Sequence, residues 1–151
     1  MSGIQGNILK GIAPLLATAG LGTYNSSAST PYLTTQTGIV IGALPTGPDN
    51  AIALMTYPVT DDPALSDSVM GLQVRTRWGG IDQTKVTDLD DAIFNYLHGK
   101  KNWIIGSGAT AVTIVQCLSN SAAPLGEDTL NRWMFSHNYY LTLWRPSTNR
   151  T

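Results

Sequence analysis

Apolar side chains at helical spacing mark the N-terminal part of the chain. In residues 4–19 they recur as they do in a helix that buries one face. The positions are Ile4, Ile8, Ile12, Leu15, Leu16 and Ala19. Pro14 interrupts this pattern, which predicts either a kink or a helix that begins just before the proline. Gly20 and Gly22 then predict where the helix ends.

A second helix is predicted over residues 82–98. Asp82 has the side chain of an N-cap residue, and Gly99 is placed as the residue that ends the helix. The apolar stripe that predicts the helix consists of Val86, Leu89, Ile93 and Leu97.

Short apolar runs bounded by turn residues predict two strands between the helices, at residues 38–43 and 51–57. Pro58 is expected to end the second strand and to open a loop over residues 59–68. Residues 69–77 alternate clearly, which predicts a half-buried strand. One face of that strand carries Met70, Leu72, Val74 and Thr76, and the other carries Gln73, Arg75 and Arg77.

Two more strands are predicted near the C-terminus, at residues 111–118 and 133–145, with a loop rich in Ser, Ala, Gly and Pro over residues 119–131. The first is nearly all apolar or Thr, which is typical of a strand covered on both faces. The second has large side chains on both faces, so neither is plainly solvated. One face has Trp133, Phe135, Tyr139, Leu141 and Leu143, and the other has Met134, Tyr140 and Trp144.

The order of these elements predicts an α+β fold, in which a mostly antiparallel (mixed) sheet of about four to five strands carries two main helices on one face. No linker or repeat divides the 151 residues, so residues 1–151 are expected to form a single domain. The segment 23–37 is rich in Ser and Thr and contains Tyr24 and Tyr32. It is either a long surface loop or an arm that orders only against a neighbouring subunit.

The charge content changes this picture of an ordinary small domain. Only 13% of the residues are charged, against about 25% in soluble domains generally. The surface is therefore either unusually poor in charge or covered by neighbouring subunits. We favour the second interpretation, because bare neutral surface favours association. The net charge is −1, and no basic patch indicates tight binding of nucleic acid.

The remaining composition bears on where the protein works. Cys117 is a lone cysteine in an apolar run, so it cannot form an intrachain disulfide and is expected to pack in the core. The first residues have no secretion signal, and no apolar stretch approaches the roughly 18 residues of a membrane span. We therefore expect synthesis and assembly in a cytoplasm, with no membrane partner.

Catalytic motifs are not found in the sequence: there is no phosphate-binding loop, zinc-protease helix or nucleophile elbow. Asp61, Asp62 and Asp67 are candidates either for a cation site or, more simply, for shaping a turn. Asp88, Asp90 and Asp91 are interpreted as a solvated helix face that suits the helix dipole, and His98 as a residue at the C-terminal end of that helix. His137 has no Cys or second His at ligand spacing, so it is interpreted as a packed or hydrogen-bonded residue rather than a ligand. The sequence predicts no enzyme, no cofactor and no metal.

Aromatic and basic side chains remain as candidates for a subunit or partner interface. Aromatic residues are enriched at protein interfaces, and the helices are expected to cover only one face of the sheet. The alternative is that the aromatic residues all serve the domain's own core. Arg75 and Arg77 share one strand face, where they are expected to meet either a lumen or an acidic neighbour. The predicted interface residues are Arg75, Arg77, Trp78, Trp133, Tyr140, Trp144, Tyr24 and Tyr32.

Several motifs together resemble a known family. They are the segment from Tyr57-Pro58 to Arg75-Thr76-Arg77, the helix with Ala92-Ile93-Phe94 and Leu97-His98-Gly99, residues 121–126, and the closing pattern Arg132-Trp133, Asn138-Tyr139-Tyr140 and Arg145-Pro146. The pattern is similar to the tail terminator or minor capsid family of siphophages, from about residue 15 to residue 150. Residues 25–30, Trp78 and the segment 103–105 depart from it.

The resemblance implies a structural virion protein that forms a homohexameric ring on the end of the tail tube and joins it to the head-completion proteins. Double-stranded DNA would pass through the lumen without sequence recognition, and low net charge suits such passage because each neutralised phosphate adds affinity. A head-completion or stopper subunit of the neck is the alternative in the same particle. A small metal-binding domain is a third hypothesis, from another class.

Overall fold

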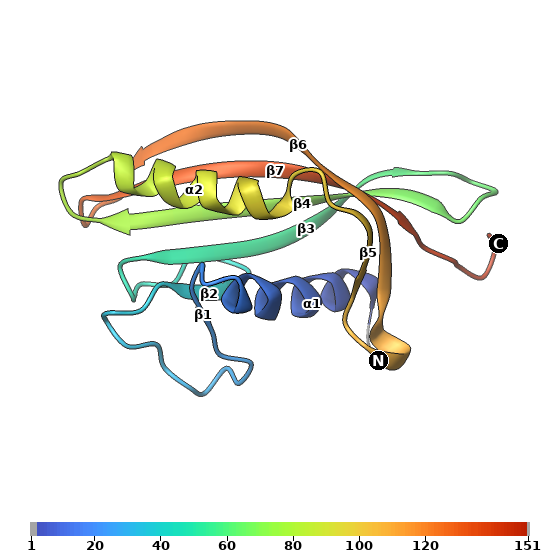
Figure 1. Ribbon diagram of the computed structural model, residues 1–151, viewed down its shortest axis with the longest axis horizontal. Coiled ribbons are helices and arrows are strands. Elements are labelled where there is room, and N and C mark those ends of the chain that lie inside the picture. The colour runs from blue at the N-terminus through green and yellow to red at the C-terminus, as the bar shows by residue number, and fades with distance from the viewer. Residues whose placement is uncertain (1–2, 151) are drawn as a thin grey trace.

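The computed structural model describes residues 3–150. Two helices lie over a curled sheet of seven strands (Figure 1). In chain order the elements are α1 (Ile4–Thr18), β1 (Thr23–Tyr24), β2 (Gly38–Ile41), β3 (Ala51–Asp61), β4 (Asp67–Gly79), α2 (Thr84–Leu97), β5 (Lys101–Ile105), β6 (Val112–Glu127) and β7 (Arg132–Trp144).

The sheet is mixed, and its strands follow the order β1-β2-β3-β4-β7-β6-β5. β1, β2 and β3 run parallel, and every other pairing is antiparallel. The predicted α+β class, with a mostly antiparallel sheet, is confirmed. The predicted number of four to five strands is wrong, because β1 and β5 were both missed.

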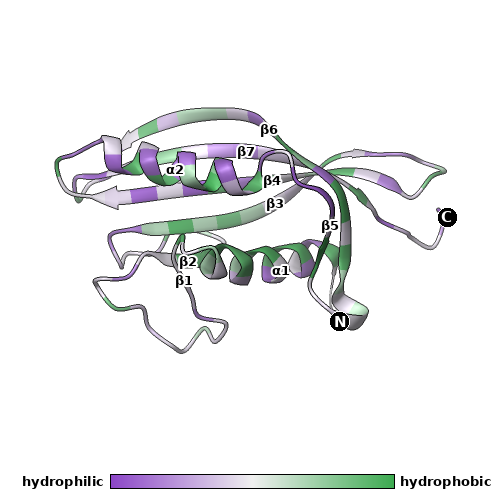
Figure 2. Ribbon diagram, in the orientation of Figure 1, coloured by the Kyte–Doolittle hydropathy of each residue, from purple (hydrophilic) through white to green (hydrophobic). Residues whose placement is uncertain are grey.

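Helix α1 confirms the predicted N-terminal helix. Ile8, Ile12 and Leu16 are fully buried, and the helix is green along most of its length in the hydropathy colouring (Figure 2). It runs through Pro14, so the alternative of a helix that begins just before the proline is wrong. Pro14 is exposed, so its ring does not disturb the buried stripe.

Helix α2 confirms the second predicted helix, with one correction at its start. The N-cap position is Gln83, not Asp82. An oxygen of Asp82 instead accepts hydrogen bonds from the backbone N–H of Thr84, at 3.0 Å, and from its hydroxyl, at 2.6 Å. Gly99 follows the helix with a φ of +87°, which is the conformation expected of a glycine that ends a helix.

One face of the sheet forms the hydrophobic core with both helices, as predicted. Paired positions such as Leu54↔Val74 and Leu72↔Tyr139 point to this face. α1 packs against β2, β3, β5 and β6, while α2 packs against β4, β6 and β7. We call this the covered face, and its opposite, on which no helix of the described chain packs, the open face. Neither helix in residues 3–150 combines the length and hydropathy of a membrane span.

Strand β3 corrects the prediction for residues 58–68. It does not stop at Pro58 but continues to Asp61, through an irregularity in register between Pro58 and Thr60. A proline is tolerated there because β2 pairs only with residues 51–54, so β3 is an edge strand at Pro58. The predicted loop 59–68 is in fact a hairpin.

Strand β6 corrects the prediction for residues 111–131. It is 16 residues long, so most of the predicted loop 119–131 is strand. Its buried and exposed positions alternate over its first half, so it is not covered on both faces as predicted. β6 bends sharply where the sheet curls (Figure 1). Its register with β7 shifts at three points, first between Ile114 and Gln116, and β-bulges of this kind bend a strand.

Candidate assembly surface

The acidic residues of the β3–β4 hairpin shape the turn and bind arginine. An oxygen of Asp62 accepts the backbone N–H groups of Ala64 and Leu65, at 2.8 and 2.7 Å, and these bonds lower the pKa of Asp62. Asp61 lies 3.6 Å from a guanidinium nitrogen of Arg150. Within residues 3–150, no group of three metal-ligating side chains is placed to hold an ion.

Asp90 and His137 form a polar network in the core that the sequence did not predict. Both carboxylate oxygens of Asp90 lie 3.0 Å from Nδ1 of His137, and Nε2 lies 2.7 Å from the hydroxyl of Ser119. A carboxylate only accepts, so Nδ1 of a neutral His137 donates to Asp90 and Nε2 accepts from Ser119. The interpretation of Asp90 as a solvated residue was wrong, because Asp90 is buried. The interpretation of His137 as a packed or hydrogen-bonded residue is confirmed. The network joins α2 to β7 and β6.

A serine hydrogen-bonded to a histidine, which is in turn hydrogen-bonded to an aspartate, is also the arrangement of the catalytic triad that activates a serine nucleophile. Catalysis would further need oxyanion donors and a cavity for the substrate. The hollow that reaches Ser119 has Val69, Leu118 and Tyr140 of the open face among its lining residues, whereas the Ser119 hydroxyl bonds His137 on the other face, beneath α2. We therefore interpret the network as a polar contact that fixes α2 on the sheet.

The sequence did contain a signal for this network. Asp90 lies four residues after Val86 and three before Ile93, so it belongs to the buried stripe of the helix rather than to its solvated face. Burial raises the pKa of Asp90, against the opposing effect of the hydrogen bond from His137. An acidic residue inside an apolar stripe predicts a buried partner.

Arg77 and Arg132 are bound within the subunit, at the end of the open face. Arg77, only 2% exposed, donates to the backbone carbonyls of Pro48 and Asp49, at 2.7 and 2.9 Å. Arg132 forms an ion pair with Asp128 at 2.8 Å and also reaches Asp49 at 3.3 Å. Burial, with the nearby charge of Arg132, lowers the pKa of Arg77. The two arginines hold the loop between β2 and β3 against the sheet.

Tyr57 packs on the open face of the sheet. Its ring lies so close over Gly71 that a Cβ there would meet ring carbon at 2.2 Å. Its hydroxyl bonds the Asn138 side chain at 3.1 Å. Other large side chains of this face are not covered: Met55 is 47% exposed and Trp144 58% exposed. Several strands thus present apolar side chains to solvent.

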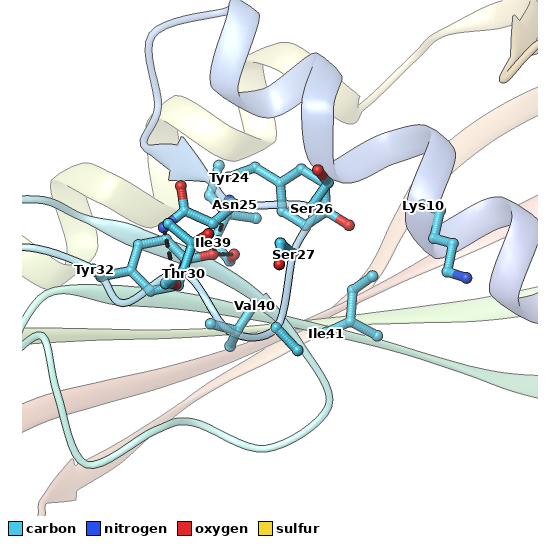
Figure 3. A pocket seen from close by; sticks show the side chains of 11 residues that line it. Lys10, Tyr24, Asn25, Ser26, Ser27, Thr30, Tyr32, Ile39, Val40 and Ile41 are labelled. Carbon is cyan, nitrogen blue, oxygen red and sulfur yellow. Dashed lines mark hydrogen bonds between the residues drawn. The ribbon is translucent and has the colours of Figure 1, made fainter.

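The polar segment between β1 and β2 folds back on its own subunit. The Tyr32 hydroxyl accepts the backbone N–H of Asn25 and donates to the carbonyl of Ile39. The side chain of Asn25 reaches the carbonyl of Thr30 at 3.3 Å. Between this segment, α1 and β2 lies a cavity of about 400 Å³, with Tyr24 and Tyr32 among its lining residues (Figure 3).

The sequence matches the family model described as bacteriophage tail terminator protein over residues 15–145. The match spans most of the chain and both ends of the sheet. The chain belongs to the bacteriophage tail terminator family. It is therefore a structural protein of the phage tail and a component of the virion.

Two other comparisons complete this result. No curated protein matches the chain. A solved structure titled "Virion of native gene transfer agent (GTA) particle" contains a chain with a TM-score of 0.53 and 13% identity, and the match covers 70% of this chain and 78% of that chain. At this identity the likeness concerns the fold alone.

On the tail terminator domain, the predicted interface residues fall into two groups. Arg77 is buried, and Trp78 and Trp133, paired across β4 and β7, are partly buried on the covered face. The other group remains at least partly accessible. It consists of Arg75, Tyr140 and Trp144 on the open face and Tyr24 and Tyr32 beside the cavity.

Proposed function

We propose that this chain is the subunit of a homohexameric ring that closes the tail tube and joins it to the head-completion proteins of the neck. Membership of the tail terminator family supports this role. So does the low charge content of 13%, because a subunit surrounded by neighbours has little need for a charged surface. DNA passes through the lumen and is not read in sequence.

The observation that carries the proposal is the open face of the sheet. Four neighbouring strands present exposed or half-buried apolar or aromatic side chains there. Met55 and Val59 on β3, Trp144 on β7 and Leu118 on β6 are exposed, and Val69 on β4 and Tyr140 on β7 are half-buried. Monomeric proteins rarely leave a large contiguous apolar patch in water, and such patches mark interaction sites. The open face, with Arg75 among its strands, is the surface that we assign to contacts with the tail tube or the neck.

Three of the predicted interface residues support the shape of this surface from inside the subunit: Arg77, Trp78 and Trp133. Arg77 fixes the loop between β2 and β3, and the two tryptophans support the adjoining ends of β4 and β7. Their replacement would alter the shape of the contact surface rather than remove a contact. Arg75 makes no such internal bond among the described residues, so it is the better residue for a charge-reversal test.

Cryo-electron microscopy of intact particles tests the proposal. A six-fold ring of this chain directly on the last layer of the tail tube is the expected result. Density on the portal side of the neck would instead assign the chain to head completion, and no density at the junction would refute both roles. Particles assembled with Arg75→Glu should show fewer joined tails, and Lys85→Glu on the exposed side of α2 is the matched control.

A further inference from the structure

The outer half of β6 is a free sheet edge. β5 pairs with β6 only as far as Gln116, so in the described chain residues 118–127 pair with β7 on one side and with no strand on the other. Nearly all of these residues are exposed. At the start of this edge the backbone N–H of Ser119 donates to Nδ1 of His98 at 2.9 Å, so the free part lies beyond Ser119. Backbone N–H and C=O groups along such an edge offer pairing to another strand.

This edge lacks charged side chains over most of its length, although Pro124 and two register shifts protect part of it. Charged side chains usually block pairing, but residues 118–126 contain none, and the first is Glu127. Leu118 and Leu125 are both exposed at the edge. Register shifts beside Ser121 and Pro124 interrupt the edge and limit how long a partner strand can be.

The opposite edge of the sheet offers a matching acceptor. β1 pairs only with Gly38 and Ile39, so Val40 and Ile41 extend beyond it. They form the floor of the cavity of about 400 Å³. The segment between β1 and β2 forms one wall, and Lys10 on α1 lies at the other side (Figure 3). Lys10 is the single charged residue of the lining.

We infer that, in the ring, the outer edge of β6 in one subunit docks into the cavity beside β2 in the next copy of this chain. The inference rests on the proposed ring. A cyclic ring needs two different patches that meet head to tail, and the two ends of one sheet meet this need. Leu125 meets the apolar floor of the cavity, and Glu127 approaches Lys10, so the two ends are complementary in polarity and in charge. The open face stays free for the tail tube and the neck.

Cysteine cross-linking in assembled particles tests the contact. Ile41→Cys and Leu125→Cys, combined in one full-length chain, place one thiol at each end of the sheet. Cys117 does not interfere, because it is buried and burial raises the pKa of its thiol to about 12. Mild oxidation is expected to give a ladder of covalent multimers that ends at the number of subunits in the ring. Each single variant should give monomers.

The outcomes separate this inference from the proposed function. A ring of normal size in which the double variant gives no multimers would overturn the edge contact and leave the ring intact. Particles without a ring of this chain would refute the proposed function as well. Multimers that stop at dimers would show an isologous contact, which also contradicts the inference.

Charge reversal gives a second test that does not depend on oxidation. Lys10 and Glu127 are both exposed, so Lys10→Glu and Glu127→Lys should leave the fold unchanged. Each is expected to lower the yield of rings several-fold, and the double variant to restore it. The matched control is the pair Lys85→Glu and Asp88→Lys on α2. Failure of the double variant to recover would contradict a contact between the two residues.

Discussion

The two faces of the sheet come from the same strands but carry different kinds of surface. On the covered face, Leu72, Tyr139 and Leu141 are almost completely inaccessible to water. On the open face, their sequence neighbours Gln73 and Tyr140 are half-buried, and Trp144 is exposed. Alternation along a strand explains how one sequence builds both faces. Apolar side chains on the covered face stabilise the subunit, whereas those on the open face are available to other proteins.

Replacing the same kind of side chain on each face should therefore give unequal losses of stability. Leu72→Ala removes a buried side chain and leaves a cavity, and we expect it to lower the free energy of unfolding by about 2–5 kcal/mol. Met55→Ala, on the open face of the adjoining strand, should change it by less than about 0.5 kcal/mol. Urea unfolding of dilute subunits measures both. Equal losses would mean that the open face is also part of the subunit's core.

The periodic spacing of buried and exposed side chains also explains which parts of the fold could be predicted from the sequence. The half-buried strand around Leu72 and the stripe of α2 were predicted correctly, because one buried face leaves a clear period. Residues 119–127 were taken for a loop, because Ser, Ala and Pro give no period when a strand is exposed along its edge. β1 was missed because it is only two residues long.

The candidate surface was harder to predict than the fold. The sequence supplied the aromatic residues and their strand faces, but it could not separate Arg75 from Arg77, which share a face and a residue type. Only the position of the loop that contains Pro48 makes Arg77 an internal residue. Likewise, Asp90 acquires its partner from a strand 47 positions away, and such a pairing depends on how the sheet and α2 pack.

Removing Asp90 from the polar network that it forms with His137 and Ser119 on the covered face should also destabilise the subunit. Asp90→Ala leaves Nδ1 of His137 without its partner, and a buried unpaired donor costs about 1–3 kcal/mol. Asp91→Ala, at an exposed position of the same helix, is the control and should have little effect. Combining Asp90→Ala with His137→Ala should cost less than the sum of the two single losses. Additive losses would show that the two residues act separately.

A smaller effect is expected from pH, again on the covered face. Burial raises the pKa of Asp90, so the folded protein holds this proton more tightly than the unfolded chain does. The stabilisation is complete below the unfolded pKa of about 3.9 and is lost as pH rises through the folded pKa. Relative to Asp90→Asn, the wild-type chain should therefore become less stable as pH rises above about 3.9. The same comparison in a His137→Gln background tests Asp90 without its histidine partner, and a trend of the opposite sign would refute the prediction.

The smallest effect on stability, and the one that separates the faces best, is expected at Trp144. Its side chain is 58% exposed, so Trp144→Ala should change the unfolding free energy of a dilute subunit by less than about 0.5 kcal/mol. If the open face meets other virion proteins, the same variant should reduce tail joining strongly, because buried tryptophans at interfaces often carry much of the binding energy. Thr142→Ala, on the same face of β7, is the control with a small side chain. Normal joining with Trp144→Ala would remove this residue from the contact surface, whereas a large loss of subunit stability would place it in the subunit's own core.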